Sequence, residues 1–465
     1  CERDWIFCFD QFSTGPAVLG FGSRHGGCDY RFAVGIVAGW RRALCGLSIG
    51  DDCFENGRSV ENQFCGTFAT LGAVMIAVSE INTFEELANL RVTWRELWEK
   101  TPNASFVQSW DWLRSYWRVY GDKQELRTLL VTLRTKPIGI VPLVTRQVET
   151  ALGATPVLTW PTNTFVPFYG AIGPNPAATL STAFSHIRRT QRNWKALELS
   201  QIDEFGHDNR RTSNALKNAR LKVCRNGAVT HPVVEMAGSW DSYMSTRDRS
   251  ARMEFLQAEK IITHCGPISF HRWRPEGGKV GATDRRWDLF RTFESIRGDS
   301  KGRGRRADRE LTVMKDAHAA AVDAGAVEVC TLTVSGRPAA CAYNYRTEAR
   351  LENVFLGARE EYGDAAVTCL LGHMLRDGFM RDDQSIVFQP HDARQVAAWS
   401  NSDATSIAYG HYAKLSPTAQ LLRRRRAAAA GDVPEQRPPV KVEVAAEEQV
   451  AAPANDSPLK VYTGA

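Results

Sequence analysis

The hydrophobic pattern between residues 73 and 145 predicts a strand, two helices and a hairpin. The strand is the apolar run Ala73 to Ile81, and Asn82-Thr83 then caps the first helix. The apolar faces of the two helices are Phe84, Leu87, Trp94 and Leu97, and then Trp110, Leu113, Trp117 and Tyr120. Two strands follow, Leu126 to Leu133 and Ile138 to Val144, joined at Arg134-Thr135-Lys136-Pro137.

A similar unit recurs near residue 311. Its helical face consists of Leu311, Met314, Ala317 and Ala321. Gly325 ends that helix, and the strands Val327 to Val334 and Ala339 to Tyr345 are joined at Ser335-Gly336-Arg337-Pro338. Both hairpins carry a basic residue and a proline at the turn, so we expect two copies of one fold. A chance match of two hairpins is the alternative.

The second copy continues with strands and helices in turn. The predicted order is a strand (Leu351 to Ala358), a turn (Glu361 to Asp364), a helix (Ala365 to Met380), a strand (Ser385 to Phe388), a short helix (Ala393 to Trp399) and a strand (Ser406 to Ala413). This order predicts a mixed α/β (α+β) fold with a largely antiparallel sheet in each half. We place the first half at residues 73–205 and the second half at residues 206–420.

The two ends of the chain lack such a pattern. Residues 1–70 have many glycines and no sustained period, so they stay unassigned, and a disordered extension is one interpretation. After Pro417, Arg423 to Arg426 precede an Ala-, Pro- and Glu-rich stretch, which predicts a flexible tail over residues 421–465. The arginines there are either a solvated cluster or a contact for nucleic acid or lipid.

Composition places the protein among cytoplasmic proteins without a membrane span or metal. No apolar run approaches the roughly 18 residues that a spanning helix needs, and nothing before Gly35 resembles a signal peptide. Of 11 cysteines, Cys1, Cys8, Cys28, Cys45, Cys53 and Cys65 fall near the start. They form no CxxC pair, so we interpret them as free thiols, with a zinc site or disulfide module as the alternative.

Positive charge is concentrated in two stretches. The net charge is only +6, yet residues 188–225 and 285–309 are each dominated by Lys and Arg. Such stretches suit the phosphates of an acyl donor, a carrier protein, tRNA or an anionic sugar polymer. Solvated faces and loops are the alternative for each.

Several segments carry a family resemblance. They are "ASFVQSWDWLRSYWRVYGDKQELRTLLVTLRTKPIGIVPL", "SNALKNARLKVCRNGAV", "RMEFLQAEK", "RWDLFRTFESI", "HAAAVDAGAVEVCTLTVSGRPAACAYNYR" and "VFQPHDARQVAAW". Over residues 73 to 420 they resemble GNAT acetyltransferases related to CelD, a cellulose-biosynthesis protein, and distantly the FemAB transferases. The resemblance implies two tandem GNAT-like (acyl-CoA N-acyltransferase) domains. It also implies transfer of an acetyl or other acyl group from acyl-CoA to an amine or hydroxyl, such as a sugar acceptor, in exopolysaccharide or cell-envelope biosynthesis.

The sequence departs from the family pattern in two places. The family has Ser-Trp-Lys-Gly where this chain has Ser300-Lys301-Gly302. It also has Asp-Phe-Gly-Pro-Gly and then Tyr-Lys, where this chain has Val387-Phe388-Gln389-Pro390-His391 and then Gln395-Val396. These changes imply either a different substrate or lost catalysis.

The resemblance also implies a donor site. In GNAT enzymes the pantetheine chain pairs with a strand, here carrying Phe355 and Gly357, and the pyrophosphate binds the first turn of the next helix. The small or hydroxyl residues of that turn are Gly363, Ala365, Ala366 and Thr368. Asp364 opposes a phosphate there, and an ordinary helix cap explains it without a ligand.

Acyl transfer further needs a general base and an acid. Candidate bases are Glu352, His391 and Asp392, and candidate acids are Tyr409 and Tyr412. His391 is favoured because it follows a strand near the expected cleft and imidazole titrates near neutral pH. An ordinary strand or loop role is the alternative for each.

Four further residues are candidates for substrate contacts. Lys217 and Arg220 lie one helical turn apart and would guide an anionic substrate, or they belong to an exposed connector. Trp160 and Tyr169 flank an aromatic loop that would stack on a sugar, or would pack between the halves.

Two other functions remain open. A FemAB-like transferase that uses aminoacyl-tRNA would explain the basic stretches, and tRNA is the only nucleic acid that we expect as a partner. A non-catalytic GNAT-fold scaffold would explain Asp364 and the departures from the family pattern.

Overall fold

The computed structural model describes residues 76–162, 166–190, 193–276, 284–300 and 305–430. All of them belong to one unit of the chain, Leu71–Ala465. The unassigned residues 1–70, the first positions of the predicted strand from Ala73, and residues 431–465 of the predicted tail lie outside the described residues.

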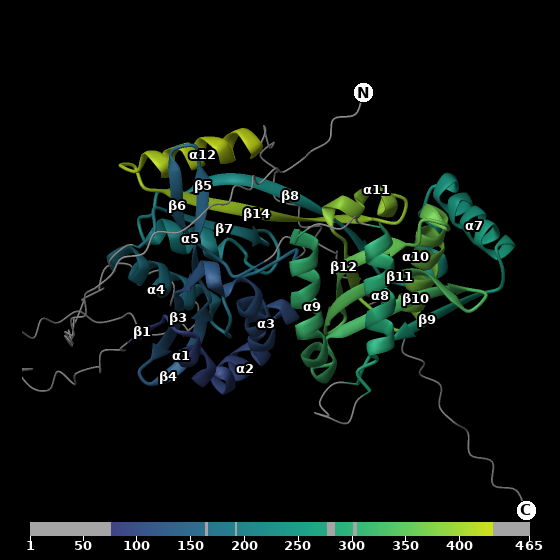
Figure 1. The fold of residues 1–465 in the computed structure, drawn as a ribbon, viewed down its shortest axis with the longest axis horizontal. Helices are drawn as coiled ribbons and strands as arrows, with labels where there is room; N and C mark the ends of the chain where they lie inside the picture. Colours follow the sequence, from purple (N-terminus) through teal and green to yellow (C-terminus); the bar gives the residue numbers. More distant parts are fainter. Residues whose placement is uncertain (1–75, 163–165, 191–192, 277–283, 301–304, 431–465) are drawn as a thin grey trace, which may run out of the picture. The chain divides into compact units, whose positions relative to one another are not determined.

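The strands form two sheets (Figure 1). The smaller sheet has the order β1-β3-β4, with β1 (Ile76–Ile81), β3 (Thr128–Leu133) and β4 (Lys136–Val141). The eleven-stranded sheet has the order β2-β5-β6-β7-β14-β8-β13-β12-β11-β10-β9. Its strands are β2 (Gln124–Leu126), β5 (Val144–Thr150), β6 (Gly153–Thr159), β7 (Ala196–Ile202), β8 (Cys224–Glu235), β9 (Ile268–Trp273), β10 (Val327–Val334), β11 (Arg337–Thr347), β12 (Arg350–Ala358), β13 (Ser385–Val387) and β14 (Ser402–Tyr412).

Helices lie along the chain between these strands, so the fold is mixed α/β as predicted. They are α1 (Phe84–Asn89), α2 (Arg91–Glu99), α3 (Trp110–Tyr120), α4 (Pro176–Arg189), α5 (Arg211–Asn218), α6 (Trp240–Ser245), α7 (Arg249–His264), α8 (Trp287–Ser300), α9 (Arg305–Asp323), α10 (Gly363–Met380), α11 (Ala393–Val396) and α12 (Pro417–Ala430). Short 3-10 turns occur at Phe106–Gln108, Gly121–Lys123 and Pro390–Asp392. Among the described strand pairs only β6–β7 and β12–β13 run parallel.

The first predicted helix is divided in two at Leu90. Thr83 caps the start of α1, in agreement with the predicted cap at Asn82-Thr83, and Glu86 completes a capping box. At Leu90 the backbone (φ −87°, ψ 4°) leaves helical geometry, and α2 begins directly afterwards. The change of direction still buries Leu87, Trp94 and Leu97 in one core.

The two hairpins share both a turn and a bulge. Each turn has two residues, and its first residue has positive φ: Arg134 at 59° and Ser335 at 50°. In each, a threonine opposes the proline, and the residue after that proline is skipped in the register. Proline cannot donate to the ladder, so a bulge at this point has the same cause in both copies. The repeat predicted from sequence is therefore present in the structure.

Strands β8 and β14 join the two halves (Figure 1). β14 is antiparallel to β8 over Ser402–Gly410 and to β7 over Ile407–Tyr412, so a strand from late in the chain lies among the strands of the first half. β8 pairs through Val233–Glu235 with β13 of the second half. The boundary at residue 205 stays a prediction, because both halves share these two strands.

The start of the predicted tail is helical rather than flexible. α12 runs from Pro417 to Ala430, and Ala419 and Leu422 are buried against Val148 and Tyr412. Arg426 donates two hydrogen bonds to Glu198 of β7, at 3.0 and 2.9 Å. The sequence pattern missed this helix because its apolar stripe is so narrow, although alanine and arginine both favour helices.

Arg426→Ala should destabilise the protein by about 1–3 kcal/mol, because Glu198 then keeps a mostly buried carboxylate without its guanidinium partner. Arg424→Ala, a change at an exposed position two residues before Arg426, should stay within about 0.5 kcal/mol of the parent. Urea unfolding of the full chain measures both variants. Equal stability of the two would show that α12 is not docked on β7 through this pair.

Candidate active site

The parallel pair β12–β13 opens after three residues. Arg350, Leu351 and Glu352 pair with Ser385, Ile386 and Val387, and the strands of the described chain then have no further pairing with each other. β12 continues to Ala358 and is held on its other side by β11. The opening therefore leaves one edge of β12 without a strand partner over residues 353–358, which are buried, and this edge leads into the turn before α10.

A buried polar network borders the opening. The Gln389 side-chain amide donates to the Asn353 carbonyl (2.9 Å) just after β13 ends. The side-chain amide of Asn353 in turn donates to the Phe355 carbonyl (2.9 Å) and to the side-chain oxygen of Asn344 (2.8 Å). Asn344 donates to Glu328 (2.8 Å), which ion pairs with Arg272 and Arg274. Two carbonyls of β12 are therefore already satisfied, and the edge is held rigid from both sides.

The predicted donor strand is buried. Phe355 is 1% exposed and its ring contacts Phe293 at 5.2 Å between centroids. Gly357 pairs with Cys341 of β11. A ligand at the opening would meet the backbone edge of these residues, because the Phe355 side chain is packed in the core.

The first turn of α10 offers backbone amides among small residues. Gly363 has a φ of 54°, donates to the Arg359 carbonyl (3.1 Å), and has nothing within 4 Å of where a Cβ would stand. Ala365 is half-buried, and Ala366 and Thr368 are buried. The free first-turn amides of a helix favour an anion.

Carboxylates surround the same turn. Glu360, Glu361 and Asp364 are exposed, and Asp364 accepts from the Gln395 side chain at 3.2 Å. The nearest cation in sequence, Arg359, is bound to Asp299 (2.8 Å) and Ser295 (3.0 Å) of α8. The charge of the turn thus opposes the anion that its amides favour. Lys301, from the departure noted in the sequence, lies outside the described residues.

Glu352 lies where the opening begins, at the seam between the halves. Ser105 of the first half donates to its carboxylate at 2.5 Å, and Thr347 donates to the Ala104 carbonyl at 3.0 Å. Burial raises the pKa of Glu352, against the lowering effects of Arg350 and Ser105. A buried carboxyl with a raised pKa and one polar partner has the properties of a general base.

One cation, Arg350, stands beside Glu352. Arg350, two residues earlier on the same strand face, lies 5.1 Å from the centre of the Phe168 ring. Its Nη1 donates to His207 at 2.5 Å. Burial, with Arg350, lowers the pKa of His207, so this imidazole stays neutral and can accept that bond.

The other candidate bases follow β13. His391 is half-exposed, and its Nε2 lies 3.4 Å from a carboxylate oxygen of the buried Asp392. Gln389, two residues earlier, contacts β12, so this short segment borders the opening.

The candidate acids lie elsewhere in the sheet. Tyr409 and Tyr412 are on the part of β14 that pairs with β7, and β8 and β13 stand between β14 and β12. The Tyr409 hydroxyl donates to Glu204, and the Tyr412 hydroxyl donates to Glu198 at 2.8 Å. Burial raises the pKa of Tyr409.

The corresponding opening in the first half is filled by the chain itself. β6 pairs with β7 only from Val157 to Thr159. Beyond it, the Tyr169 backbone N–H donates to the Gln201 carbonyl (2.8 Å), and the Gln201 side-chain amide donates to the Val166 carbonyl (2.5 Å). Trp160 and Tyr169 are 1% and 5% exposed, so these rings belong to the core. Residues 163–165 of the aromatic loop lie outside the described residues.

The remaining candidates are on the surface of the first half. Lys217, on α5, and Arg220, just after it, are exposed, while Ala215 and Leu216 bury the opposite side of the helix. The polar partners that sequence reasoning missed are Ser105, Arg350, Asn353 and Gln389. Their importance depends on contacts between distant segments, for which the sequence has no local signal.

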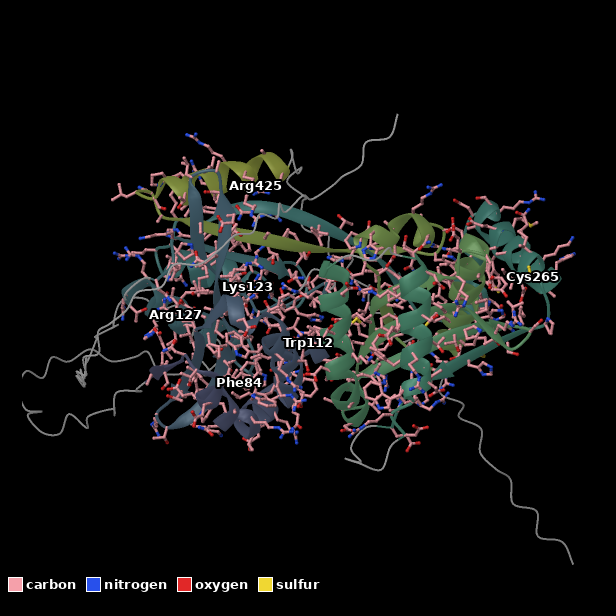
Figure 2. The ribbon with its side chains drawn as sticks, in the orientation of Figure 1. Phe84, Trp112, Lys123, Arg127, Cys265 and Arg425 are labelled. Carbon is pink, nitrogen blue, oxygen red and sulfur yellow. The ribbon has the colours of Figure 1, made fainter. Side chains whose placement is uncertain are left out.

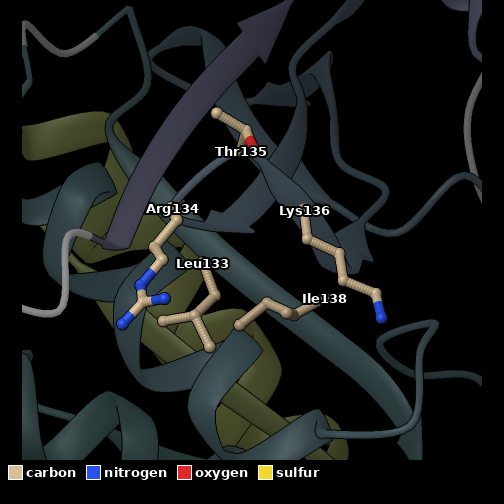
Figure 3. Close-up of a pocket in the computed structure, with 5 residues that line it drawn as sticks. All are labelled: Leu133, Arg134, Thr135, Lys136 and Ile138. Atoms are coloured by element: carbon tan, nitrogen blue, oxygen red, sulfur yellow. The ribbon is translucent and has the colours of Figure 1, made fainter.

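Two cavities are found away from the opening. One of about 320 Å³ is lined by Leu133, Arg134, Thr135, Lys136 and Ile138 at the β3–β4 turn (Figure 3). The other, about 590 Å³, follows the edge strand β9 and includes Arg272, Arg286 and Arg381. Neither is lined by Glu352 or by the first turn of α10. Within the described residues, no cluster of His, Cys, Asp and Glu could hold a metal ion, and no helix is long and apolar enough to cross a membrane.

Comparison with known proteins finds a family model that matches part of the chain. Residues 249–394 match the acetyltransferase (GNAT) domain. The match runs from α7 to α11 and includes the β12–β13 opening, Glu352 and the first turn of α10, but excludes Tyr409 and the first half. The second half therefore contains a GNAT-like fold, and the match supports a transferase activity. GNAT domains generally use acyl-CoA.

Solved structures give only distant likenesses. FemX has 10% identity and a TM-score of 0.48, with 72% of this chain and 98% of FemX covered. A tandem GNAT protein from the clavulanic acid biosynthesis pathway has 10% identity and a TM-score of 0.36, with 74% and 100% covered. No curated protein sequence matches the chain. Similarity this low says nothing about a substrate.

Glu352→Gln should be more stable than the parent at neutral pH, and the difference should disappear below about pH 4. The folded pKa of Glu352 is raised, so the parent loses stability as the pH rises from the unfolded pKa through the folded one. Glutamine keeps the acceptor for Ser105 and carries no charge. Chemical denaturation at several pH values measures the difference. A variant that is less stable than the parent across the whole range would contradict a raised pKa.

Proposed function

We propose that the chain is an acyltransferase that moves an acetyl or other acyl group from acyl-CoA to an amine or hydroxyl. The observation that carries the proposal is the opening of β12–β13 beside Glu352, which leads directly into the first turn of α10. An extended pantetheine chain would pair with the open edge of β12, and the pyrophosphate would meet the first-turn amides. Phe355, Gly357, Gly363, Ala365, Ala366 and Thr368 are the residues of this proposed donor site.

Glu352 is the group that we propose as the general base. The acceptor would lose a proton to this carboxylate while its nitrogen or oxygen attacks the thioester carbonyl carbon. The carbon–sulfur bond then breaks, and CoA leaves as a thiolate that takes up a proton. Burial keeps the pKa of Glu352 raised, which makes its carboxylate a stronger base, and Ser105 fixes its orientation.

His391 and Asp392 are the remaining candidates for handling the proton of the thiolate, because they follow Gln389 at the border of the opening. Tyr409 is a weaker candidate, since its hydroxyl already donates to Glu204. The acceptor would enter at the seam between the halves, where Ser105 meets Glu352. Lys217 and Arg220 would guide an anionic acceptor from the surface of the first half.

The substrate class rests on the resemblance to CelD-related proteins. It suggests a sugar or amine acceptor in exopolysaccharide or cell-envelope biosynthesis, with the protein in the cytoplasm. A non-catalytic scaffold is the second candidate, favoured by the carboxylates around Asp364 and by the two β12 carbonyls that Gln389 and Asn353 already occupy. Acyl transfer that Glu352→Gln abolishes would exclude the scaffold, and transfer that survives this change would exclude Glu352 as the base.

Acetyl-CoA and longer acyl-CoAs should raise the melting temperature of the full chain in a thermal-shift titration. Asp364→Asn should bind the acyl-CoA about two- to fivefold more tightly at low salt, because it removes a negative charge beside the helix amides. Asp382→Asn removes an equally exposed acid after the other end of α10, and it should leave the affinity unchanged.

No stabilisation by any acyl-CoA, up to about millimolar concentration, would contradict the donor assignment. Filter binding with aminoacyl-tRNA separates the FemAB-like alternative, for which tight and steeply salt-dependent binding is expected. Equal effects of the two asparagine variants would place the pyrophosphate away from the first turn of α10.

A further inference from the structure

The surface around α12 combines positive charge with one fully exposed aliphatic side chain. Lys414 and Leu415 form the turn before the helix, and Leu415 is 99% exposed. Arg423 and Arg424 are exposed on the helix itself, and Figure 2 shows the neighbouring Arg425 at the same surface. This α12 surface belongs to the first half of the sheet and is no part of the proposed donor site.

The fold holds this surface in a fixed place. Ala419 and Leu422 anchor one side of α12 in a small core with Val157, and Arg426 binds Glu198. The opposite side of the helix therefore faces solvent.

A neighbouring loop adds one lysine to the α12 surface. The Ala413 amide donates to the Lys195 carbonyl at 2.8 Å, which brings Lys195 beside Lys414. Lys195 is exposed. The cations of the surface thus come from two segments of the chain, the loop before β7 and the stretch from Lys414 through α12.

The nearby acids do not neutralise these cations. Glu198 is bound by Arg426 and Tyr412, and Glu204 by Arg225 and Tyr409. In the described part of the chain, no ion pair is found for Lys195, Lys414, Arg423 or Arg424. The α12 surface therefore keeps a positive potential that attracts an anionic partner.

We propose that the α12 surface docks the protein on a membrane that contains anionic phospholipid. Clustered Lys and Arg on a helix at the protein surface bind the negative headgroups, and Leu415 enters the headgroup boundary beside Lys414. A nucleic acid fits less well, because the tryptophan and tyrosine rings near this surface, Trp194 and Tyr412, are buried and cannot stack on bases. Moving the exposed Leu415 side chain from water into a lipid surface lowers the free energy of binding, whereas a phosphate backbone offers it no apolar contact.

Vesicle co-sedimentation of the full chain tests this proposal. The protein should bind phosphatidylcholine vesicles that contain phosphatidylglycerol and should leave pure phosphatidylcholine vesicles in the supernatant. Arg423→Ala/Arg424→Ala should weaken the binding at least about tenfold, since each surface cation contributes separately to the attraction. Leu415→Ser should weaken it most clearly at high salt, where the charges are screened.

The matched control is Arg134→Ala/Lys136→Ala, which removes two exposed charges at the β3–β4 turn and should bind like the parent. If both double variants lose the same amount of vesicle binding, the binding depends on net charge and not on the α12 surface, and the proposal is overturned. Absence of binding to the anionic vesicles would overturn it as well. Binding of an RNA oligomer that needs Arg423 and Arg424, without vesicle binding, would assign the surface to nucleic acid instead. Unfolding curves of all variants show whether any loss comes from instability.

Discussion

The backbone pairing of β14 with both β7 and β8 is the constraint on which the rest of the structure depends. β14 comes from late in the chain, yet it completes the strands of the first half, while β8 passes on to β13 of the second half. The two halves therefore share one sheet. Because neither half can close its strands alone, the seam between them is fixed by hydrogen bonds rather than by a flexible linker.

This seam explains why one opening of the sheet is available and the other is filled. Both halves contain a short parallel pair that opens after three residues. In the first half the Gln201 contacts draw the loop after β6 into the gap. In the second half β12 turns at once into α10, and the gap is bordered by Gln389. Each opening begins at a buried carboxyl. Glu198 at the first opening is bound by Arg426 and Tyr412, whereas Glu352 at the second is bound by Ser105, which crosses the seam.

Local features of this fold were accessible from the sequence. The β10 and β12 strands, the start of α1 and both hairpin turns were predicted, because caps, prolines and alternating apolar residues act within a few positions. The shared bulge after Pro137 and Pro338 follows from the missing proline donor. The helix break at Leu90 and the helix α12 were missed, since both depend on packing against strands elsewhere in the chain.

The sequence predicted some residues of the candidate site but not the contacts that connect them. Glu352 was one of three candidate bases from its strand and its charge, but its burial and its raised pKa come from Ser105 and the opposite half. Tyr409 was a candidate from its residue type, and the strand exchange then placed it beside Glu204. Trp160 and Tyr169 were candidates for stacking on a sugar, and burial makes them core residues instead. Pairing between strands that are distant in the sequence leaves no pattern within either strand. These contacts therefore could not be predicted from local sequence features.

Amide hydrogen exchange with and without a bound acyl-CoA tests the central claim most directly, namely that the open edge of β12 is the donor site. The account predicts new protection at residues 353–358 and in the first turn of α10, with no change in residues 199–202 of β7, where the chain fills its own gap. Protection confined to β7 and the loop after β6, or protection at neither opening despite saturating ligand, would contradict it.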